Sequence, residues 1–444
     1  MSTHLKRELT LRDGTALVVG SIIGTGIFLK TATMSNYLPN PLWVLLAWVV
    51  GGLLSFMGAL TYAKLGSLFP EAGGEYAYLK RGYGHLVAFL YGWTRFWIGA
   101  PGSIAAYAVG ATTFISSVFN FQNHLYQKLI AISLIALFTI LNCARVSFAG
   151  KIQSIMTLVK IGIMLFLALG IYLYSPNVSL DHFTYSSDTT FSISSFGMAL
   201  LASLWAYDGW NNLSMVGGEI DKAEKNISLS LIIGMFIVLI IYGGINFAYF
   251  YALPMEEILS ANSKMNPHAL PVATKAAMTF LGEKSLIFLS MAFVFSSLGA
   301  MNGSILSGAR VPFAMAEDKL FFEKLGRLSK KNGAPVTSLI VQALIAMILA
   351  LSGSFDQLTD YVVFAAWVFY GLTATLSFKF TREGLIKKEG YWKWAYPVLP
   401  MTFVGITIWL VINTIQNSFH STLIGAVFVI LGIPAYLIFF KPKA

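Results

Sequence analysis

Twelve predominantly apolar stretches of about 20 residues divide this chain of 444 residues, and that length matches a helix that crosses a lipid bilayer. Hydrophobic residues make up 56% of the chain and charged residues only 11%, whereas about a quarter of residues are charged in soluble domains. The charges gather in short segments between the stretches. The chain is therefore predicted to be an all-α integral membrane protein with about twelve transmembrane helices. The stretches are centred near Ile22, Val50, Gly99, Leu134, Ile163, Leu204, Ile237, Phe295, Leu344, Ala366, Thr407 and Phe428.

The distribution of lysine and arginine predicts how the chain crosses the membrane. If the N-terminus is cytoplasmic, 23 of the 30 basic residues fall in inward-facing segments and five in outward-facing segments, while Arg95 and Lys160 lie within spans. Cytoplasmic loops carry the excess of basic residues, so both termini are expected in the cytoplasm. The net charge of +10 then reflects contact of the basic loops with anionic lipid of the bilayer and requires no nucleic acid.

Two of the apolar stretches carry glycine and polar residues where a membrane helix should be continuous. They are the segments 20–28, Gly-Ser-Ile-Ile-Gly-Thr-Gly-Ile-Phe, and 205–212, Trp-Ala-Tyr-Asp-Gly-Trp-Asn-Asn. A free backbone N–H or C=O costs several kcal/mol in hydrocarbon unless it meets protein partners or lines a polar cavity. Broken helices at corresponding positions of two chain halves are typical of a transporter's binding site, so the substrate is expected at these two breaks.

The spacing of the breaks predicts an inverted repeat within a single transmembrane domain, 1–444. Spans one to five (11–175) and six to ten (192–380) form two sets of five, each beginning with a broken span, and two further helices occupy 393–440. An odd number of spans per set places the second set upside down relative to the first, as in many carriers.

The first break favours an anion. Gly20, Gly24 and Gly26 tolerate unusual backbone angles and leave room for a ligand to approach the main chain. Unwinding frees the N–H groups of an outer half-helix that is expected to start near Gly26 or Ile27, and these groups and the helix dipole favour a carboxylate. The alternative is close packing of helices through small residues.

The second break offers carbonyl groups and an aromatic side chain. Free carbonyls near Trp205 to Tyr207 would accept hydrogen bonds from a substrate ammonium, and the Trp205 ring could close over the ligand. Ordinary packing is the alternative for Trp205. Asp208 could pair with a cation, but we expect it to cap the second half-helix by accepting backbone N–H bonds.

Lys160 lies roughly nine residues inside the fifth span, or about 13 Å at 1.5 Å per residue. An ammonium at that depth costs roughly 3 kcal/mol on insertion scales, so it should point towards carbonyls or water, and the freed carbonyls of the first break would serve. The alternative is snorkelling to the cytoplasmic interface.

Arg95 is likewise expected to face protein or water. Tyr242, Asn246 and Asn302 are expected to face the bundle and to bond neighbouring helices.

Two loops are expected on the cytoplasmic face. The segment 70–84 contains Pro70 and the pair Gly73-Gly74, followed by a short interfacial helix over 75–79. The second segment is 310–331. Solvated connectors are the alternative for both.

No cofactor or metal is expected. The single cysteine, Cys143, and the six histidines show no metal-ligand spacing. An enzyme would need a nucleophile or paired carboxylates at membrane depth, yet Asp208 is the only acidic residue placed well inside a span. A channel would favour rings of like charge.

Three motifs together resemble the amino acid–polyamine–organocation (APC) superfamily: Gly20 to Phe28, the Pro-x-x-Gly-Gly-x-Tyr-x-Tyr segment at 70–78, and Ala206 to Asn211. Within it the chain resembles the L-amino acid transporter family, particularly bacterial exchangers of small neutral amino acids. The resemblance implies a LeuT-type fold in the plasma membrane. Its implied substrate contacts are Ile22, Ile23, Gly24, Thr25 and Gly26 for the carboxylate, Trp205 as the outer gating aromatic, and Ala206, Tyr207, Asp208 and Gly209 as pocket wall.

The resemblance also implies roles for two residues outside the breaks. Lys160 matches a family lysine whose ammonium replaces the sodium ion of sodium-coupled relatives, and Tyr242 matches a tyrosine that links the first break to the opposite bundle.

The sequence departs from the family's pattern in two places. The gate is usually Phe, so Trp205 changes the pocket volume. The outer loop 119–127 lacks the cysteine that bonds a glycoprotein in animal members, so no disulfide-linked heavy-chain partner is expected.

These observations predict sodium-independent exchange of small neutral L-amino acids by alternating access. The alternative is a proton-coupled amino acid symporter in which Lys160 loses and regains its proton, because burial lowers a lysine pKa.

Overall fold

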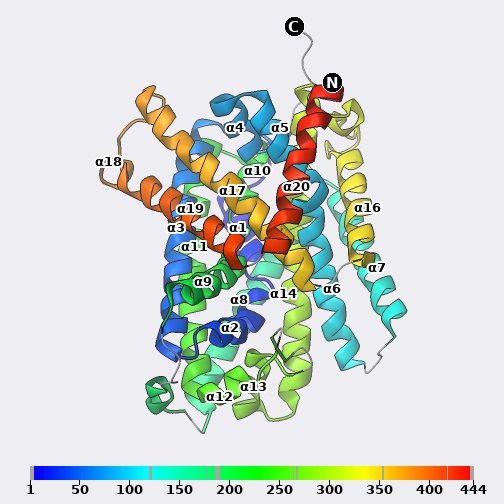
Figure 1. Cartoon of the computed structure of the whole chain (residues 1–444). Coiled ribbons are helices and arrows are strands. Elements are labelled where there is room, and N and C mark those ends of the chain that lie inside the picture. The colour runs from blue at the N-terminus through cyan, green and yellow to red at the C-terminus, as the bar shows by residue number, and fades with distance from the viewer. Residues whose placement is uncertain are drawn as a thin grey trace.

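The computed structural model describes residues 5–119, 123–176, 178–185, 191–263, 265–266, 269–352, 355–417 and 419–440. These residues are almost wholly helical and form an elongated bundle (Figure 1). Within them, eight helical segments are long and apolar enough to cross a membrane, and further apolar helices are shorter. The prediction of a helical membrane protein is therefore confirmed. The described residues yield fewer full-length spans than the twelve expected, and four further apolar helices are 10–17 residues long.

The first half of the chain contains two helices separated by an interruption and then a series of longer ones. A π-helical turn, η1, joins α5 and α6 into one continuous rod. The elements are α1 (Leu11–Ile22), α2 (Gly26–Tyr37), α3 (Pro41–Leu68), α4 (Glu75–Tyr83), α5 (His85–Thr94), η1 (Arg95–Gly99), α6 (Ala100–Val118), α7 (His124–Asn142), α8 (Val146–Tyr174) and the 3-10 turn η2 (Leu180–Thr184).

The second half also begins with an interrupted helix. Its elements are α9 (Ile193–Tyr207), α10 (Asn212–Met215), the 3-10 turn η3 (Gly217–Glu219), α11 (Ala223–Ala252), α12 (Met255–Leu259), α13 (Val272–Leu281), α14 (Lys284–Gly308), α15 (Arg310–Glu317), the 3-10 turn η4 (Glu323–Gly326), α16 (Val336–Ser352), α17 (Phe355–Arg382), α18 (Trp392–Ala395), α19 (Val398–Asn417), α20 (Phe419–Ala435) and the π-helical turn η5 (Tyr436–Phe440).

Side-chain caps explain where several helices begin. Thr10 and Asp13 form a capping box at α1, and Asn40 accepts from the N–H groups of the first turn of α3. Each such cap satisfies N–H groups that have no intrahelical partner. The N-terminus of α2 differs, because its N-cap residue Thr25 makes no side-chain cap bond. The start of α2 is thus left with donors that the helix itself does not use.

The broken helix α1–α2 lies at the centre of the bundle. α1 packs against α11, α8 and α14, and α2 packs against α9. Apolar side chains face outward along the peripheral helices, for example Leu158 and Leu173 of α8, at 64% and 67% exposure. Contiguous apolar surface of this kind marks contact with lipid.

Polar side chains inside the bundle are paired between helices. Asn142 of α7 donates to Asn302 of α14 at 2.8 Å, and Asn302 donates to Gln153 of α8 at 2.7 Å. Thr31 of α2 donates to Asn246 of α11 at 2.6 Å. The prediction that Asn246 and Asn302 bond neighbouring helices is confirmed.

The two ends of the bundle differ. At one end, called the α4 end, α4 and α5 lie together, and residues near Leu9 and Ala72 pair with the segment around η3 through isolated β-bridges (Figure 1). Near the chain's C-terminus, Phe440 contacts Phe321 and Phe89. The predicted helix over 75–79 is confirmed as part of α4.

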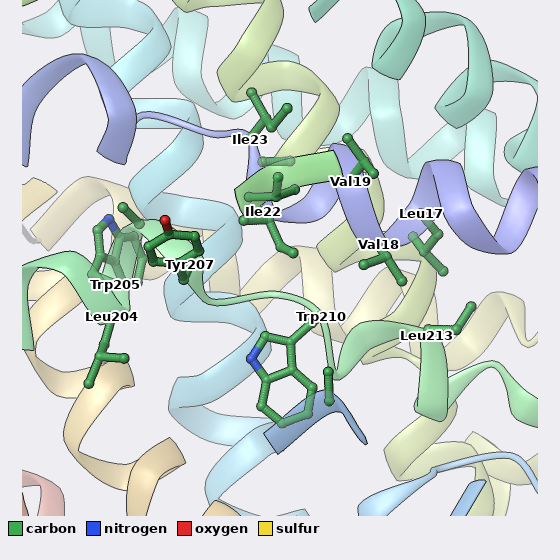
Figure 2. Packing of buried hydrophobic residues seen from close by; sticks show 14 of the residues in the cluster. Leu17, Val18, Val19, Ile22, Ile23, Leu204, Trp205, Tyr207, Trp210 and Leu213 are labelled. Atoms are coloured by element: carbon green, nitrogen blue, oxygen red, sulfur yellow. The ribbon is translucent and has the colours of Figure 1, made fainter. Parts of the chain in front are cut away.

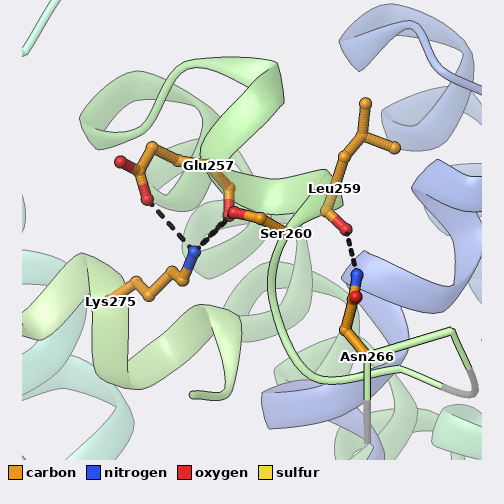
Figure 3. Close-up of polar contacts among 5 residues, drawn as sticks. All are labelled: Glu257, Leu259, Ser260, Asn266 and Lys275. Carbon is orange, nitrogen blue, oxygen red and sulfur yellow. Dashed lines mark hydrogen bonds and ion pairs between the residues drawn. The ribbon is translucent and has the colours of Figure 1, made fainter. Parts of the chain in front are cut away.

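At the opposite, α12 end, the segment after α11 folds over α2. Figure 3 shows Lys275 of α13 bonded to the carboxylate and carbonyl of Glu257 and to the hydroxyl of Ser260, while Asn266 donates to the carbonyl of Leu259. Both α12 and α13 contact α2. These bonds hold the loop as a compact cover on that end of the first broken helix.

Candidate functional site

The first helix break lies where the sequence predicted it. α1 ends at Ile22, and Ile23 leaves the helical conformation with φ −68° and ψ 87°. α2 then begins at Gly26, the position expected for the outer half-helix. The first N–H groups of a helix have no intrahelical partner, so the turn around Thr25 and Gly26 presents donors towards the interior of the protein.

Most of the carbonyl groups released by this break are already occupied by side chains. The Lys160 ammonium donates to the carbonyls of Gly20 at 2.7 Å and Ile23 at 2.6 Å. The Ser296 hydroxyl lies 3.0 Å from the carbonyl oxygens of both Ile23 and Gly24. Lys160 is fully buried, so it turns inward to these carbonyls and does not snorkel.

Hydroxyl donors at the same break have no such partner. The Oγ of Ser21 and the Oγ1 of Thr25 are buried and make no hydrogen bond within the residues that the structure describes. Buried polar groups are nearly always hydrogen-bonded, and an unpaired one costs about 1–3 kcal/mol. With most of its carbonyls occupied, the break is left mainly with N–H and O–H donors, which is the composition of an anion site.

The second break faces the first. α9 ends at Tyr207, Asp208 is extended with φ −70° and ψ 152°, and Gly209 has φ +115°, a region that favours glycine. α10 does not start until Asn212. Figure 2 shows Ile22 and Ile23 on one chain segment and Trp205 and Tyr207 on the other, close together in the interior.

Close backbone approach holds the two breaks together. A Cβ added to Gly26 would lie 2.6 Å from the Cβ of Ala206, and a Cβ on Gly209 would lie 3.0 Å from the carbonyl of Ser21. No side chain fits at either position without displacing backbone. The glycines therefore allow the two interrupted helices to touch where both are unwound.

Tyr242 of α11 connects both breaks. Its hydroxyl lies 3.0 Å from the carbonyl of Ile22 and 3.1 Å from the carbonyl of Ala206. A hydroxyl carries one proton, so these carbonyls share one donor. The tyrosine is fully buried, and it satisfies carbonyls that lie far from each other in sequence.

Trp205 packs beside a residue that the sequence analysis did not select. Its ring is stacked on Tyr107 of α6, with centroids 6.2 Å apart and an interplanar angle of 29°. Tyr107 also lies against the first break, because a Cβ on Gly24 would be 3.2 Å from its ring. Tyr107 and Ser296 are thus neighbours of the breaks that the sequence did not single out. Ser296 carried a weak signal as one of two adjacent serines in an apolar span.

The predicted capping role of Asp208 is wrong. α10 begins after Asn211 with no side-chain cap, and the Asp208 carboxylate instead accepts from the Tyr370 hydroxyl of α17 at 2.7 Å. The backbone changes direction at Gly209, between Asp208 and Asn212. The Asp208 carboxylate therefore lies beside α17 and does not cap the first turn of α10.

Ion pairs link neighbouring elements at the α4 end. Arg310 of α15 donates from Nε to Glu219 at 2.9 Å and from Nη2 at 3.0 Å, and both side chains are buried. Lys80 of α4 contacts Asp318 at 2.6 Å, in a more exposed pair. A cavity of about 400 Å³ opens beside this second pair, lined among others by Arg7, Tyr76 and Phe313.

Two interrupted helices that meet inside an apolar bundle, with their free donors turned inward, are the architecture of a membrane transporter. Sequence comparison specifies the family of transporter. The chain belongs to the amino acid permease family, whose sequence model matches residues 9–435. The predicted membership of the APC superfamily is confirmed, and the chain is a transporter and not an enzyme.

Full-length relatives support this assignment. The serine/threonine exchanger SteT of Bacillus subtilis (strain 168) is 30% identical over 99% of this chain and 98% of its own length. The b(0,+)-type amino acid transporter 1 of Homo sapiens is 27% identical over 100% of this chain and 90% of its own. The cystine/glutamate transporter of Homo sapiens is 29% identical, covering 98% and 86%.

Proposed function

We propose that this chain exchanges small neutral L-amino acids across the membrane without sodium, with the substrate's α-carboxylate bound at the start of α2. The observation that carries the proposal is the chemistry left at the first break. Lys160, Ser296 and Tyr242 occupy most of its carbonyls, whereas the hydroxyls of Ser21 and Thr25 are buried and have no partner among the described residues. A carboxylate supplies the acceptors that these donors lack.

The substrate ammonium is assigned to the carbonyls of the second break. Ala206 and Tyr207 lie against Gly26 and Ile22, so a small zwitterion bound at α2 meets both breaks at once. Trp205 and Tyr107 would form the wall around the substrate side chain. Two stacked aromatic rings leave room for a small side chain, which agrees with the serine and threonine named for the bacterial relative.

Lys160 supports independence from sodium. Its ammonium places a fixed positive charge between the carbonyls of Gly20 and Ile23, the kind of oxygen ligands that a cation would otherwise bind. Alternating access would then move the helices around this centre, with the substrate biasing the equilibrium through its differential affinity for the two states.

The finer architecture belongs to the same proposal. It comprises a LeuT-type fold with twelve spans, repeats over 11–175 and 192–380, additional helices over 393–440, both termini in the cytoplasm of a bacterial cell, and function without a heavy-chain partner. The common location of Leu9, Ala72 and Phe440 at the α4 end supports termini on one side.

The test is transport of labelled serine by the purified protein in liposomes. Uptake should require unlabelled amino acid inside and should be unchanged when sodium is replaced by choline. Alanine, threonine and cysteine should compete, whereas lysine and glutamate should not. Uptake into empty liposomes driven by external acid would favour the proton-coupled alternative, and a requirement for sodium would overturn the role assigned to Lys160.

A further inference from the structure

A second polar cluster lies between the helix breaks and the α4 end. It contains the carboxyl groups of Glu75 and Asp208, the guanidinium of Arg95, and three tyrosine hydroxyls. All of these side chains are buried except that of Asp208, which is partly exposed, and Glu75 is completely inaccessible. The tyrosines are Tyr62 of α3, Tyr91 of α5 and Tyr370 of α17.

Tyrosine hydroxyls hold one oxygen of each carboxyl group. Tyr62 donates to Oε1 of Glu75, and Tyr370 donates to Oδ1 of Asp208 at 2.7 Å. The Arg95 guanidinium makes no ion pair among the described residues. Its Nη2 donates to the Met215 sulfur at 3.5 Å, although Arg95 interacts electrostatically with both carboxyl groups.

Several atoms of this cluster have no partner. The second oxygen of Glu75, the hydroxyl of Tyr91 and the Nε of Arg95 are buried and lack a hydrogen bond within the described part of the chain. The Tyr91 hydroxyl nevertheless lies near enough to Glu75 to lower the pKa of its carboxyl group. A proton on the free oxygen of Glu75 would provide a donor where only an unpaired acceptor now lies.

The net charge of the cluster also favours binding of a proton. Two ionised carboxylates and one guanidinium leave a net charge of −1, and an uncompensated buried charge is costly in a low dielectric. One added proton makes the cluster neutral. Burial raises the pKa of the Glu75 carboxyl and the charge of Asp208 adds to this effect, whereas Tyr62, Tyr91 and Arg95 oppose it.

The cluster links the second break to the α4 end. Asp208 belongs to the second break, and Glu75 begins α4 directly after Gly74, whose added Cβ would lie 2.6 Å from the backbone of Ser214 in α10. Ala72 and Val216 pair through a β-bridge beside this contact. Opening of the α4 end would separate these segments and admit water to Glu75.

We propose that Glu75 and Asp208 form a proton-binding site, which holds one proton between the two carboxyl groups while the α4 end is closed and releases it to water when that end opens. The inference rests on the proposed function only in assigning the opening step to transport. It places the proton at a site other than Lys160, and it makes the rate of exchange depend on pH even without a pH gradient.

The first test measures serine exchange in liposomes with equal pH inside and outside, from pH 5.5 to 8.5. The wild-type rate should rise at least about threefold across this range, because opening requires proton release. Glu75→Gln, which keeps the closed cluster neutral at every pH, should be slow and nearly independent of pH. Glu323→Gln is the control, because Glu323 is exposed and is not among the groups that act on Glu75, and it should retain the wild-type profile. A flat wild-type profile, or a rising one in Glu75→Gln, overturns the proposal.

The second test does not depend on transport. The melting temperature of the detergent-solubilised wild type should fall by several degrees from pH 5.5 to 8.5. The folded protein holds a proton that the unfolded chain has lost in this range, so stability decreases as pH rises. Glu75→Gln should lose most of this fall and Glu323→Gln none of it. Equal falls in melting temperature in all three proteins would overturn the proton site. If the wild type shows the pH-dependent melting temperature but does not exchange serine, only the proposed function is overturned.

Discussion

Lys160 and Tyr242 bond different carbonyl groups of the same unwound turn. The ammonium of Lys160 bonds the carbonyls of Gly20 and Ile23, while the hydroxyl of Tyr242 lies 3.0 Å from the carbonyl of the intervening residue Ile22. One side chain comes from α8 and the other from α11. Carbonyl groups that a continuous helix would have bonded internally are thus bonded to two separate helices, which ties the break to both.

Replacement of Lys160 should abolish transport. Lys160→Ala leaves the buried Gly20 carbonyl without its donor, at a cost of about 1–3 kcal/mol, leaves the Ile23 carbonyl with Ser296 alone, and removes the charge from the first break. We expect at least a tenfold loss of serine exchange in liposomes while the protein is still produced in the membrane. Lys151→Ala, at an exposed position of the same helix, is the control. Near-normal exchange by Lys160→Ala would refute its assignment.

Tyr242→Phe should separate the two breaks with little change in packing. The ring remains among Trp48 and Tyr207, but the carbonyls of Ile22 and Ala206 lose their shared donor. We expect exchange to fall by about tenfold and stability by about 1 kcal/mol, measured by serine counterflow and thermal unfolding. Tyr251→Phe on the same helix should leave both unchanged. If the two variants behave alike, the hydroxyl of Tyr242 has no special role.

Gly26→Ala should inactivate the protein through a steric clash. Its methyl group would lie 2.6–2.7 Å from Cβ and Cα of Ala206, so one of the two breaks must move. We expect at least a tenfold loss of exchange and a lower melting temperature. Gly243→Ala is the matched control, because its methyl group would meet nothing within 4 Å and alanine favours a helix. Normal transport by Gly26→Ala would show that the breaks do not meet in the working protein.

The buried pair Arg310–Glu219 should matter more for stability than the exposed pair Lys80–Asp318. Removal of one partner leaves a buried charge, so Arg310→Met should cost about 3–5 kcal/mol, whereas Lys80→Met should cost only about 0–1 kcal/mol. Thermal or denaturant unfolding of the purified variants measures the difference. In a double-mutant cycle, Glu219→Gln should add little to Arg310→Met. Additive losses would contradict a direct pairing of these side chains.

Trp205→Phe should change the preferred size of substrate. The smaller ring leaves space beside Tyr107, against which Trp205 is stacked. We expect leucine to compete with labelled serine at least about threefold better than in the wild type, because one or two extra methylene groups in a pocket change affinity by about that order or more. Unchanged competition by leucine, with serine transport intact, would place Trp205 outside the substrate pocket.

The helix breaks were predictable because they are local. Glycine and polar residues within an apolar run disfavour a continuous helix, and in lipid the freed backbone groups need partners. The structure interrupts the helices at these segments, at Ile23 and again at Asp208. The inward direction of Lys160 followed from the same reasoning, because a charge at that depth requires nearby acceptors.

The partners of Asp208, Ser296 and Arg310 were not predictable in this way. Asp208 meets Tyr370, 162 residues away, Ser296 meets Gly24 at a separation of 272, and Arg310 meets Glu219 at 91. Such pairings depend on which helices lie side by side and at what rotation. The helices α3 and α14 carry apolar residues on every side, because one side meets protein and the other meets lipid. Their sequence pattern therefore does not reveal which face is inward.

By itself, then, the sequence determined the membrane-spanning helical class, the two interruptions and the need of Lys160 for buried acceptors, because each follows from the cost of exposing polar groups to hydrocarbon. Only the tertiary structure decided that the two breaks touch, that Tyr242 serves both, and that Glu75 and Asp208 share one buried cluster. These relationships arise from helix packing between distant segments, where close approach and hydrogen-bond geometry select among partners that look equivalent along the chain.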